Sequence, residues 1–481
     1  MLFISGGLFF RSLLACNYSL WWDEGAMFFT SWKRNIWQII FSSSWDIPSH
    51  PPVTHILLHF WQKISINLYW LRLPSLVFSG LFLFLVPLDV RKIFPREKKM
   101  PFLVLVSFVF SHPLVSLGFQ LRPYALELFL MMLSLFLFFY MWNKKTESKK
   151  WPLFNGLLLF LMFLTDYSSV WLLLVYFVFY CYLFFKNQKK IFRNFLSMSL
   201  FLLGLLSLCW LPFFFRWLPL AFQGEEYLKD YNGGQVGLPI FFLEGHRLVG
   251  INDKASPFIP AIFRSNAYFL LLVGLSLLGN WFFRKKYKLK ADFFLILLIL
   301  PTLTSFFFSK YFTIIFLWRN LIIVHLAFIV NFCFLIYLLS QKFSSLYALM
   351  ILVTILNFIL SYPSLYIGPS LNWKNAAQLV DENVDNRAFI VTAQKWILTP
   401  LAYYGLLIDR CRWFNFWEDR IIWVDDFSEK SILRVQQEKP PAVFFFLDSR
   451  EYENTELKNR FNCKDKKILT IDSFYLIECW Q

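Results

Sequence analysis

The sequence predicts a membrane protein: an all-α multi-span bundle of about 11 transmembrane helices, followed by a small extracytoplasmic α/β domain at the C-terminus. Composition predicts the bundle, because 58% of the residues are apolar and only 16% are charged, whereas soluble domains carry roughly 25% charged residues. The second domain is predicted by a change of character after residue 362, where long apolar runs give way to mixed charges. We therefore expect a membrane domain over 1–362 and an α/β domain over 363–481.

The membrane domain is defined by its apolar runs. A helix that crosses a bilayer needs about 20 such residues. Besides a helix at the very start, the sequence contains these runs: 72–90, 101–119, 124–142, 152–166, 168–185, 194–215, 265–283, 291–308, 320–340 and 344–362. Only ten residues precede Arg11, too few to cross. We therefore expect a first helix that is short and tilted, or a sequence that begins further upstream.

Basic clusters predict which loops are cytoplasmic. Lysines and arginines gather at Arg91–Lys99, Lys144–Lys150, Lys186–Arg193 and Arg284–Lys290, and more weakly at Lys342. Cytoplasmic loops of membrane proteins carry such an excess. This order places a first loop (17–71), a large loop (216–264) and the C-terminal tail outside. The net charge of +16 is thus a topology signal, and we expect no nucleic-acid partner.

The tail alternates predicted strands and helices. The stretches "RAFIVTA", "RIIWVDD" and "PAVFFFLD" are typical of strands, and helical patterns lie near 373–384, 396–408, 428–438 and 451–461. Such alternation favours a small α/β domain. It contains neither a GxGxxG motif nor a P-loop, so we expect a docking or lid domain.

Polar residues gather in the predicted outer loops. The stretch "SLWWDEGAMFFTSW" places Asp23 and Glu24 side by side in the first of these loops. His55 and His59 are four residues apart, so they share one face of the helix that Pro51 and Pro52 would start. The remaining outer-side candidates, which we expect to bind substrate together with His55, are Asp46, His50, Arg72, Arg122, Tyr124, Asp166, Lys310 and Arg319. Ionisable groups near a bilayer are expensive and are functional candidates by default.

Transfer of a group from a lipid phosphate suits this set. Arginines hold phosphates well and bidentately, and a carboxylate can take the proton from an attacking hydroxyl. The paired acids Asp23 and Glu24 could also hold a divalent cation such as Mg or Mn, although nothing in the sequence requires one.

Each of these residues has a structural alternative. Asp23 and Glu24 could stabilise the N-terminus of a helix that begins at Gly25, and the two histidines could simply be packed in the core. Arg72 and Arg122 could be interfacial anchors whose stems lie along apolar surface. Asp166 could be a structural hydrogen-bond acceptor. The sequence leaves these alternatives open.

Five stretches together resemble the GT-C superfamily of integral membrane glycosyltransferases, in the branch of the protein O-mannosyltransferases and lipid A aminoarabinose transferases. In the family's order they are "LWWDEG", "HPPVTHILLHFW", "RLPSLVFSG", "RPYALELFLMMLSL" and "LWRNLIIVHLAFI". Two positions depart from the family pattern: Gln120 stands where an acid is common, and Asn320 where a tyrosine is usual.

The resemblance implies an inverting transfer of a sugar from a polyprenyl-phosphate donor to a hydroxyl of an envelope glycolipid, glycan or protein outside the cytoplasmic membrane. It assigns the catalytic base to Asp23, with Glu24 beside it, and places Arg122 and Arg319 among the donor contacts. The competing readings are a lipid-linked sugar flippase or transporter, and an inactive membrane scaffold. A flippase would favour ionisable residues at mid-span and internal repeats.

Overall fold

The computed structural model of the chain describes residues 2–20, 22–32, 35–41, 51–144, 150–186, 189–209, 266–311, 321–366, 373–384, 389–392, 395–408, 421–423, 443–448, 465–471 and 474–480. The chain divides into two compact units. The first consists of Met1–Cys16, Arg34–Phe60 and Leu71–Ile367, and the second of Asn17–Lys33, Trp61–Trp70 and Gly368–Gln481.

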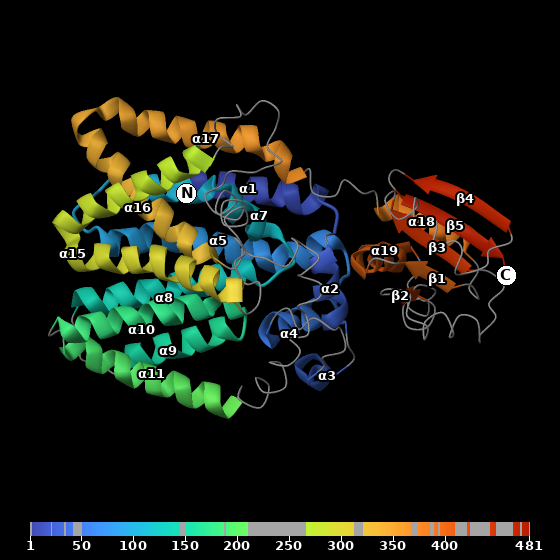
Figure 1. Ribbon diagram of the computed structural model, residues 1–481, viewed down its shortest axis with the longest axis horizontal. Coiled ribbons are helices and arrows are strands. Elements are labelled where there is room, and N and C mark those ends of the chain that lie inside the picture. The colour runs from blue at the N-terminus through green and yellow to red at the C-terminus, as the bar shows by residue number, and fades with distance from the viewer. Residues whose placement is uncertain are drawn as a thin grey trace. The chain divides into compact units, whose positions relative to one another are not determined.

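All the regular elements in the described part of the first unit are helices (Figure 1). In chain order its helices are α1 (Leu2–Asn17), α3 (Ile36–Phe41), α4 (Pro52–Trp61), α5 (Leu68–Ile93), α6 (Met100–Val109), α7 (His112–Phe119), α8 (Tyr124–Lys144), α9 (Lys150–Phe163), the 3₁₀ turn η1 (Tyr167–Ser169), α10 (Val170–Phe185), α11 (Lys189–Cys209), α15 (Asn266–Tyr311), α16 (Ile322–Lys342) and α17 (Ser344–Tyr366). The helix predicted to start at Pro51–Pro52 is confirmed, since α4 begins at Pro52.

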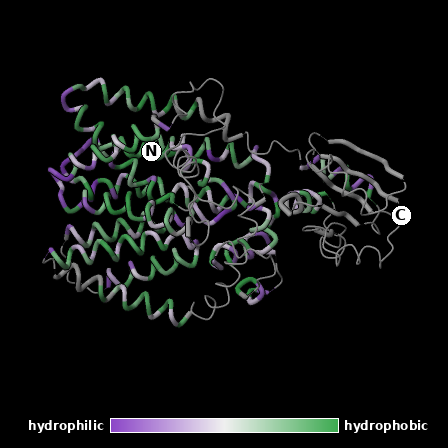
Figure 2. Tube along the Cα trace, viewed as in Figure 1, coloured by the Kyte–Doolittle hydropathy of each residue, from purple (hydrophilic) through white to green (hydrophobic). Residues whose placement is uncertain are grey.

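Five described helices are long and apolar enough to cross a membrane, or six if α6 and α7 form one bent span. Apolar residues line the helices, whereas hydrophilic residues gather at the helix ends on the left of Figure 2. The chain is therefore built as an integral membrane protein. Other apolar helices, such as α1 and α9, are shorter. The expectation of a short first helix agrees with α1, which has 16 residues and runs through the fully buried Arg11.

The predicted run 101–119 is broken into α6 and α7, which are bent by 60°. Pro113 lies in the first turn of α7. Proline has no N–H to give to the carbonyl four residues earlier, and its ring clashes with that carbonyl. Here that carbonyl belongs to Val109, the last residue of α6. It accepts a hydrogen bond from Arg11 Nη1 at 3.2 Å instead, so a residue of α1 stabilises the break.

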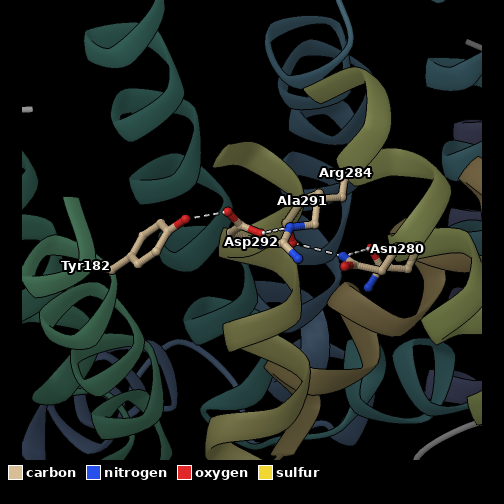
Figure 3. Close-up of polar contacts among 6 residues, drawn as sticks. Tyr182, Asn280, Arg284, Ala291 and Asp292 are labelled. Atoms are coloured by element: carbon tan, nitrogen blue, oxygen red, sulfur yellow. Dashed lines mark hydrogen bonds and ion pairs between the residues drawn. The ribbon is translucent and has the colours of Figure 1, made fainter. Parts of the chain in front are cut away.

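The helix α15 folds back on itself near Tyr287, whose φ of −134° and ψ of 54° are not helical. Asn280 Nδ2 donates to the carbonyl oxygen of Ala291 at 2.9 Å. Residues eleven apart in a straight helix are separated by roughly 16 Å along its axis, so the two halves must lie side by side. Arg284 and Asp292 form an ion pair of 2.8 Å, and Tyr182 of α10 donates to Asp292 at 2.7 Å (Figure 3).

The second unit contains α2 (Trp22–Ser31), α18 (Trp373–Asn383), α19 (Lys395–Ile408) and a mixed five-stranded sheet. The sheet order is β2-β1-β3-β5-β4. The strands are β1 (Phe389–Thr392), β2 (Ile421–Trp423), β3 (Val443–Asp448), β4 (Asp465–Ile471) and β5 (Phe474–Trp480). β1 pairs with β2 and β3 in parallel, and β5 pairs with β3 and β4 antiparallel. The three expected strands coincide with β1, β2 and β3. Strands β4 and β5 were not predicted from the sequence.

Candidate functional site

The first unit places several predicted site residues at one end of its helices. Arg72 lies near the start of α5, Arg122 directly before α8, and Asp166 between α9 and η1. The opposite ends of α5 and α8 also meet, since Asn143 Nδ2 donates to the carbonyl oxygen of Lys92 at 2.8 Å. The candidate residues are thus separated by the length of the helices from the basic loop that begins at Arg91.

Arg72 is fully buried and ties α5 to α1. Its Nη1 donates to the carbonyl oxygen of Ala15 at 3.0 Å. Ala15 lies in the last turn of α1, where carbonyls have no partner within their own helix. The guanidinium carbon also lies 5.6 Å from the ring centre of Phe119. Arg72 therefore has a structural role, and the substrate contact predicted for it stays a prediction.

Arg122 and Tyr124 form a buried pair in the turn between α7 and α8. Arg122 Nη2 donates to the Tyr124 hydroxyl at 3.0 Å, and the guanidinium carbon is 5.0 Å from the Tyr124 ring centre. Only 5% of Arg122 and 1% of Tyr124 is exposed. The two residues therefore act as one unit, in which the ring fixes the orientation of the cation.

A pocket opens beside Arg122. Among the described residues that line it, Arg122 is the one charged residue, and the others come from α4, α5 and the start of α8: Thr54, Leu57, Leu58, Leu71, Pro74, Ser75, Phe78, Leu121 and Leu126. Ligand pockets commonly combine an apolar lining with a few well-placed polar groups. An apolar wall with a single cation suits an anionic amphiphile.

Two buried carboxylates meet next to this turn. Ser168 connects them, because its backbone N–H donates to Asp166 Oδ1 at 2.8 Å and its hydroxyl donates to Glu127 Oε1 at 2.5 Å. Each carboxylate residue is 4% exposed. Glu127 Oε2 is buried and accepts no hydrogen bond from the described residues. Like charges at close range are costly in an apolar environment, so this pair is a second candidate feature.

Glu127 was not among the predicted site residues. It lies within the stretch "RPYALELF", five residues after Arg122. The available signal was a carboxylate inside an otherwise apolar run, which marks a functional candidate. Its partner Ser168 is 41 residues away in the chain, so sequence spacing could not reveal the pairing.

The histidines of α4 are both buried, with 6% of His55 and 4% of His59 exposed. The start of α4 is fixed by a hydrogen bond from the Val53 N–H to the carbonyl oxygen of Leu164, at 3.1 Å. Leu164 is two residues from Asp166, so α4 is anchored beside the carboxylate pair. Substrate binding by His55 stays a prediction.

Asp23 and Glu24 lie in the second unit, in the first turn of α2. The helix begins at Trp22 rather than at Gly25, so both carboxylates are inside the turn where negative charge is favourable. Glu24 is fully buried. Within this unit α2 packs against α19, where the rings of Phe28 and Tyr403 meet edge to face at 5.2 Å.

The segment that follows α4 is also anchored within the second unit. The Tyr403 hydroxyl donates to the carbonyl oxygen of Ile66 at 2.7 Å. Trp61 and Trp70 stack at 4.6 Å with their planes 3° apart, and each indole N–H donates to the other residue's carbonyl. Pro74 cannot bond the Trp70 carbonyl, so the Trp61 indole takes that place at 2.7 Å.

Four predicted site residues cannot be placed in these networks. Asp46, His50 and Arg319 lie outside the described residues, and Lys310 falls within α15 but its side chain is not described. Within the described ranges, no group of three or more His, Cys, Asp or Glu side chains is arranged to hold a metal ion. The convergence of Asp23 with the arginines, and a metal at Asp23 and Glu24, stay predictions.

The fold and the buried polar end of the bundle define a polytopic membrane protein with a candidate site at the ends of its spans. Two crystal structures of ArnT from Cupriavidus metallidurans share this fold. The structure bound to undecaprenyl phosphate matches with a TM-score of 0.59 and 11% identity, and the apo structure with 0.58 and 12%. Each match covers 99% of this chain and 97% of that chain. The GT-C fold implied by the sequence resemblance is therefore confirmed.

No family model matches the sequence. No curated protein matches it either.

Proposed function

We propose that the protein is a glycosyltransferase that takes a sugar from a polyprenyl-phosphate-linked donor and transfers it to an acceptor hydroxyl at the outer face of the membrane. The observation that carries the proposal is the full-length likeness to an ArnT structure bound to undecaprenyl phosphate. A shared fold does not by itself define a function, so the residues at the helix ends must supply the chemistry.

The pocket beside Arg122 supports a polyprenyl-phosphate partner. Its apolar lining from α4 and α5 suits an isoprenoid chain, and the Arg122 guanidinium suits the attached phosphate. Arg319 is the second proposed phosphate contact. Asp23 is the proposed base that takes the proton from the attacking hydroxyl, which gives an inverting transfer, with Glu24 beside it. A divalent cation held by these two acids is compatible with the same reaction.

The remaining parts of the proposal concern topology. Eleven spans place Asp23, Arg122 and the C-terminal α/β domain outside the cytoplasmic membrane, and the basic loops inside it. The acceptor is an envelope glycolipid, glycan or protein.

The test uses the purified full-length chain with polyprenyl-phosphate-linked sugars as donors. Asp23→Asn should abolish transfer but retain donor binding, because the variant keeps the shape of the side chain and loses only the base. Glu382→Gln, at an exposed position of α18, is the control and should keep both. Equal transfer rates for Asp23→Asn and the parent would refute the base assignment. Movement of the donor across vesicles without any transfer would instead favour a flippase.

Mass spectrometry of envelope glycolipids and glycoproteins from cells with and without the gene would identify the product. A mass loss of one sugar on one class of molecule is the expected result. It would name both the sugar and the acceptor.

A further inference from the structure

Two loops at the end of the helices opposite the candidate site are bound to each other. Glu97 accepts a hydrogen bond from the Tyr287 hydroxyl at 3.0 Å and forms an ion pair with Lys286. The Lys290 ammonium donates to the carbonyl oxygens of Lys92 and Ile93, at 3.0 and 2.9 Å. Residues 91–99 and 284–290, which lie far apart in the sequence, therefore form one surface, called here the basic platform.

The platform carries a dense positive charge. Its cations are Arg91, Lys92, Arg96, Lys98, Lys99, Arg284, Lys285, Lys286, Lys288 and Lys290. Glu97 is the one acid within these two segments. Since only 2% of the Glu97 side chain is exposed and it is already paired with Lys286, it cannot compensate the charges on the surface.

Part of this charge has a structural use. Arg284 pairs with Asp292 (Figure 3), and Lys286 and Lys290 hold the two segments together. Other lysines lie over aromatic rings, Lys92 over Tyr140 and Lys99 over Tyr347. Four cations remain that are exposed and form no hydrogen bond or ion pair within the described part of the chain: Arg91, Arg96, Lys98 and Lys288.

An exposed tryptophan places the platform at the level of lipid headgroups. Trp281 is 52% exposed, and the Lys285 ammonium lies 3.6 Å from its ring centre. Tryptophans on membrane proteins concentrate at the membrane–water interface, so the lysines next to Trp281 lie near the lipid phosphates.

Topology alone does not account for this arrangement. The positive-inside rule requires basic residues in cytoplasmic loops, but it does not require two such loops to bind each other and bring their like charges together. Repulsion among them opposes that assembly. Phosphates of anionic lipids remove the repulsion, and basic surfaces between transmembrane helices bind such headgroups.

We propose that the basic platform binds the phosphodiester groups of anionic glycerophospholipids in the adjoining leaflet. Arg91, Arg96, Lys98 and Lys288 make the contacts, while Glu97, Lys286 and Lys290 hold the two segments in place. This site lies at the other end of the helices from Arg122 and is independent of the sugar transfer proposed above.

The test compares the full-length protein with the triple variant Arg96→Gln, Lys98→Gln and Lys288→Gln. Within the described part of the chain, the side chains of these residues form no hydrogen bond or ion pair between the two segments. The control, Lys150→Gln, Lys342→Gln and Lys374→Gln, removes the same charge from exposed positions elsewhere. Affinity for phosphatidylglycerol and for phosphatidylcholine is measured by native mass spectrometry of protein released from nanodiscs of each composition, with inorganic phosphate as a separate probe.

The parent protein should retain phosphatidylglycerol in preference to phosphatidylcholine. The triple variant should lose affinity for phosphatidylglycerol by roughly 10- to 100-fold, and the control variant should keep it. The proposal is overturned if the control loses as much affinity as the triple variant, or if the parent does not discriminate between the two lipids. Inorganic phosphate that competes with phosphatidylglycerol at millimolar concentration would also overturn it, because the site would then bind free anions.

Discussion

Arg11 in α1 donates to the carbonyl oxygen of Val109, four residues before Pro113. The contact joins a fully buried cation to the one carbonyl of α6 that the proline leaves without its helical partner. It also places a positive charge at the C-terminus of α6, where the helix dipole is negative. Arg11 interrupts the apolar run from which the first helix was predicted. In the structure, its contact with Val109 stabilises the break between α6 and α7.

The first prediction concerns this contact and takes the form of a double-mutant cycle. Arg11→Met should lower the melting temperature, because an unsatisfied buried carbonyl costs about 1–3 kcal/mol. In a Pro113→Ala background the same change should cost less, since the introduced alanine has a backbone N–H that can donate to the Val109 carbonyl. The measurement is thermal unfolding of the four proteins in detergent. Additive effects would show that the two residues are not coupled.

The helices of the bundle could be predicted because apolar length is a local property of the sequence. The run 124–142 corresponds to α8, which ends only two residues later, and the run 320–340 to α16. The break between α6 and α7 could not be predicted from the same signal. The apolar residues continue through it, and the contact that stabilises it comes from a residue about 100 positions earlier in the chain.

The tail shows the same limit. β1, β2 and β3 contain continuous apolar residues and were foreseen, whereas β4 begins with the charged residues Asp465, Lys466 and Lys467. The sequence near β4 therefore looks polar, and its strand character depends on pairing with β5. The exact number of spans and the location of this domain stay predictions.

For the candidate site, the residues that could be predicted from the sequence are those whose own side chains are unusual for their position. Arg122 and Asp166 were chosen because a charge stands out at the end of an apolar run. Their partners were not chosen: Ser168 is an ordinary hydroxyl, and Glu127 is surrounded by leucines. The backbone contact of Arg72 with Ala15 could not be foreseen either, since it depends on how α1 packs against α5.

The second prediction compares two glycines of α15. A Cβ on Gly279 would collide with the backbone carbonyl oxygen of Asn331 in α16, whereas a Cβ on Gly274 would meet no atom within 4 Å. Small residues allow membrane helices to approach this closely. Gly279→Ala should destabilise the protein by about 1–3 kcal/mol. Gly274→Ala should be neutral or stabilising by about 0.5–1 kcal/mol.

Melting temperatures of the two alanine variants test this prediction on the same helix. The expected order is Gly279→Ala lowest, with Gly274→Ala equal to or above the parent. If the two variants have the same melting temperature, α15 and α16 do not pack at Gly279 as described.

The third prediction concerns the carboxylate pair. Ser168→Ala removes the hydroxyl that donates to Glu127, and a buried acceptor that loses its hydrogen bond should cost about 1–3 kcal/mol. Glu127→Gln keeps an oxygen that accepts from Ser168 and removes the acidic group beside Asp166, so it should cost less than Ser168→Ala or raise stability.

The readout is the melting temperature together with sugar transfer. If Asp166 binds substrate, Glu127→Gln should change the KM for the donor or acceptor while the variant remains folded. A drop in stability for Glu127→Gln that equals the drop for Ser168→Ala would contradict the idea that the closeness of the two acidic groups costs stability.

The last prediction follows from the Glu97 contacts at the basic platform. Burial acts to raise the pKa of this carboxyl, but hydrogen bonds from Lys286, Tyr337 and Tyr287 and the charge of Lys286 outweigh it, so its pKa lies below the ordinary 4.5. A carboxyl with a lowered pKa contributes stability that is present above its unfolded pKa and is lost as the pH falls through the folded pKa. The melting temperature of the parent should therefore fall on acidification below about pH 4.5. Glu97→Gln should have a lower melting temperature than the parent at neutral pH, and that temperature should change less with pH. Glu382→Gln, the exposed control, should follow the parent. A constant difference between the parent and Glu97→Gln from pH 7 to pH 3 would mean that the charge of Glu97 does not stabilise the joined loops.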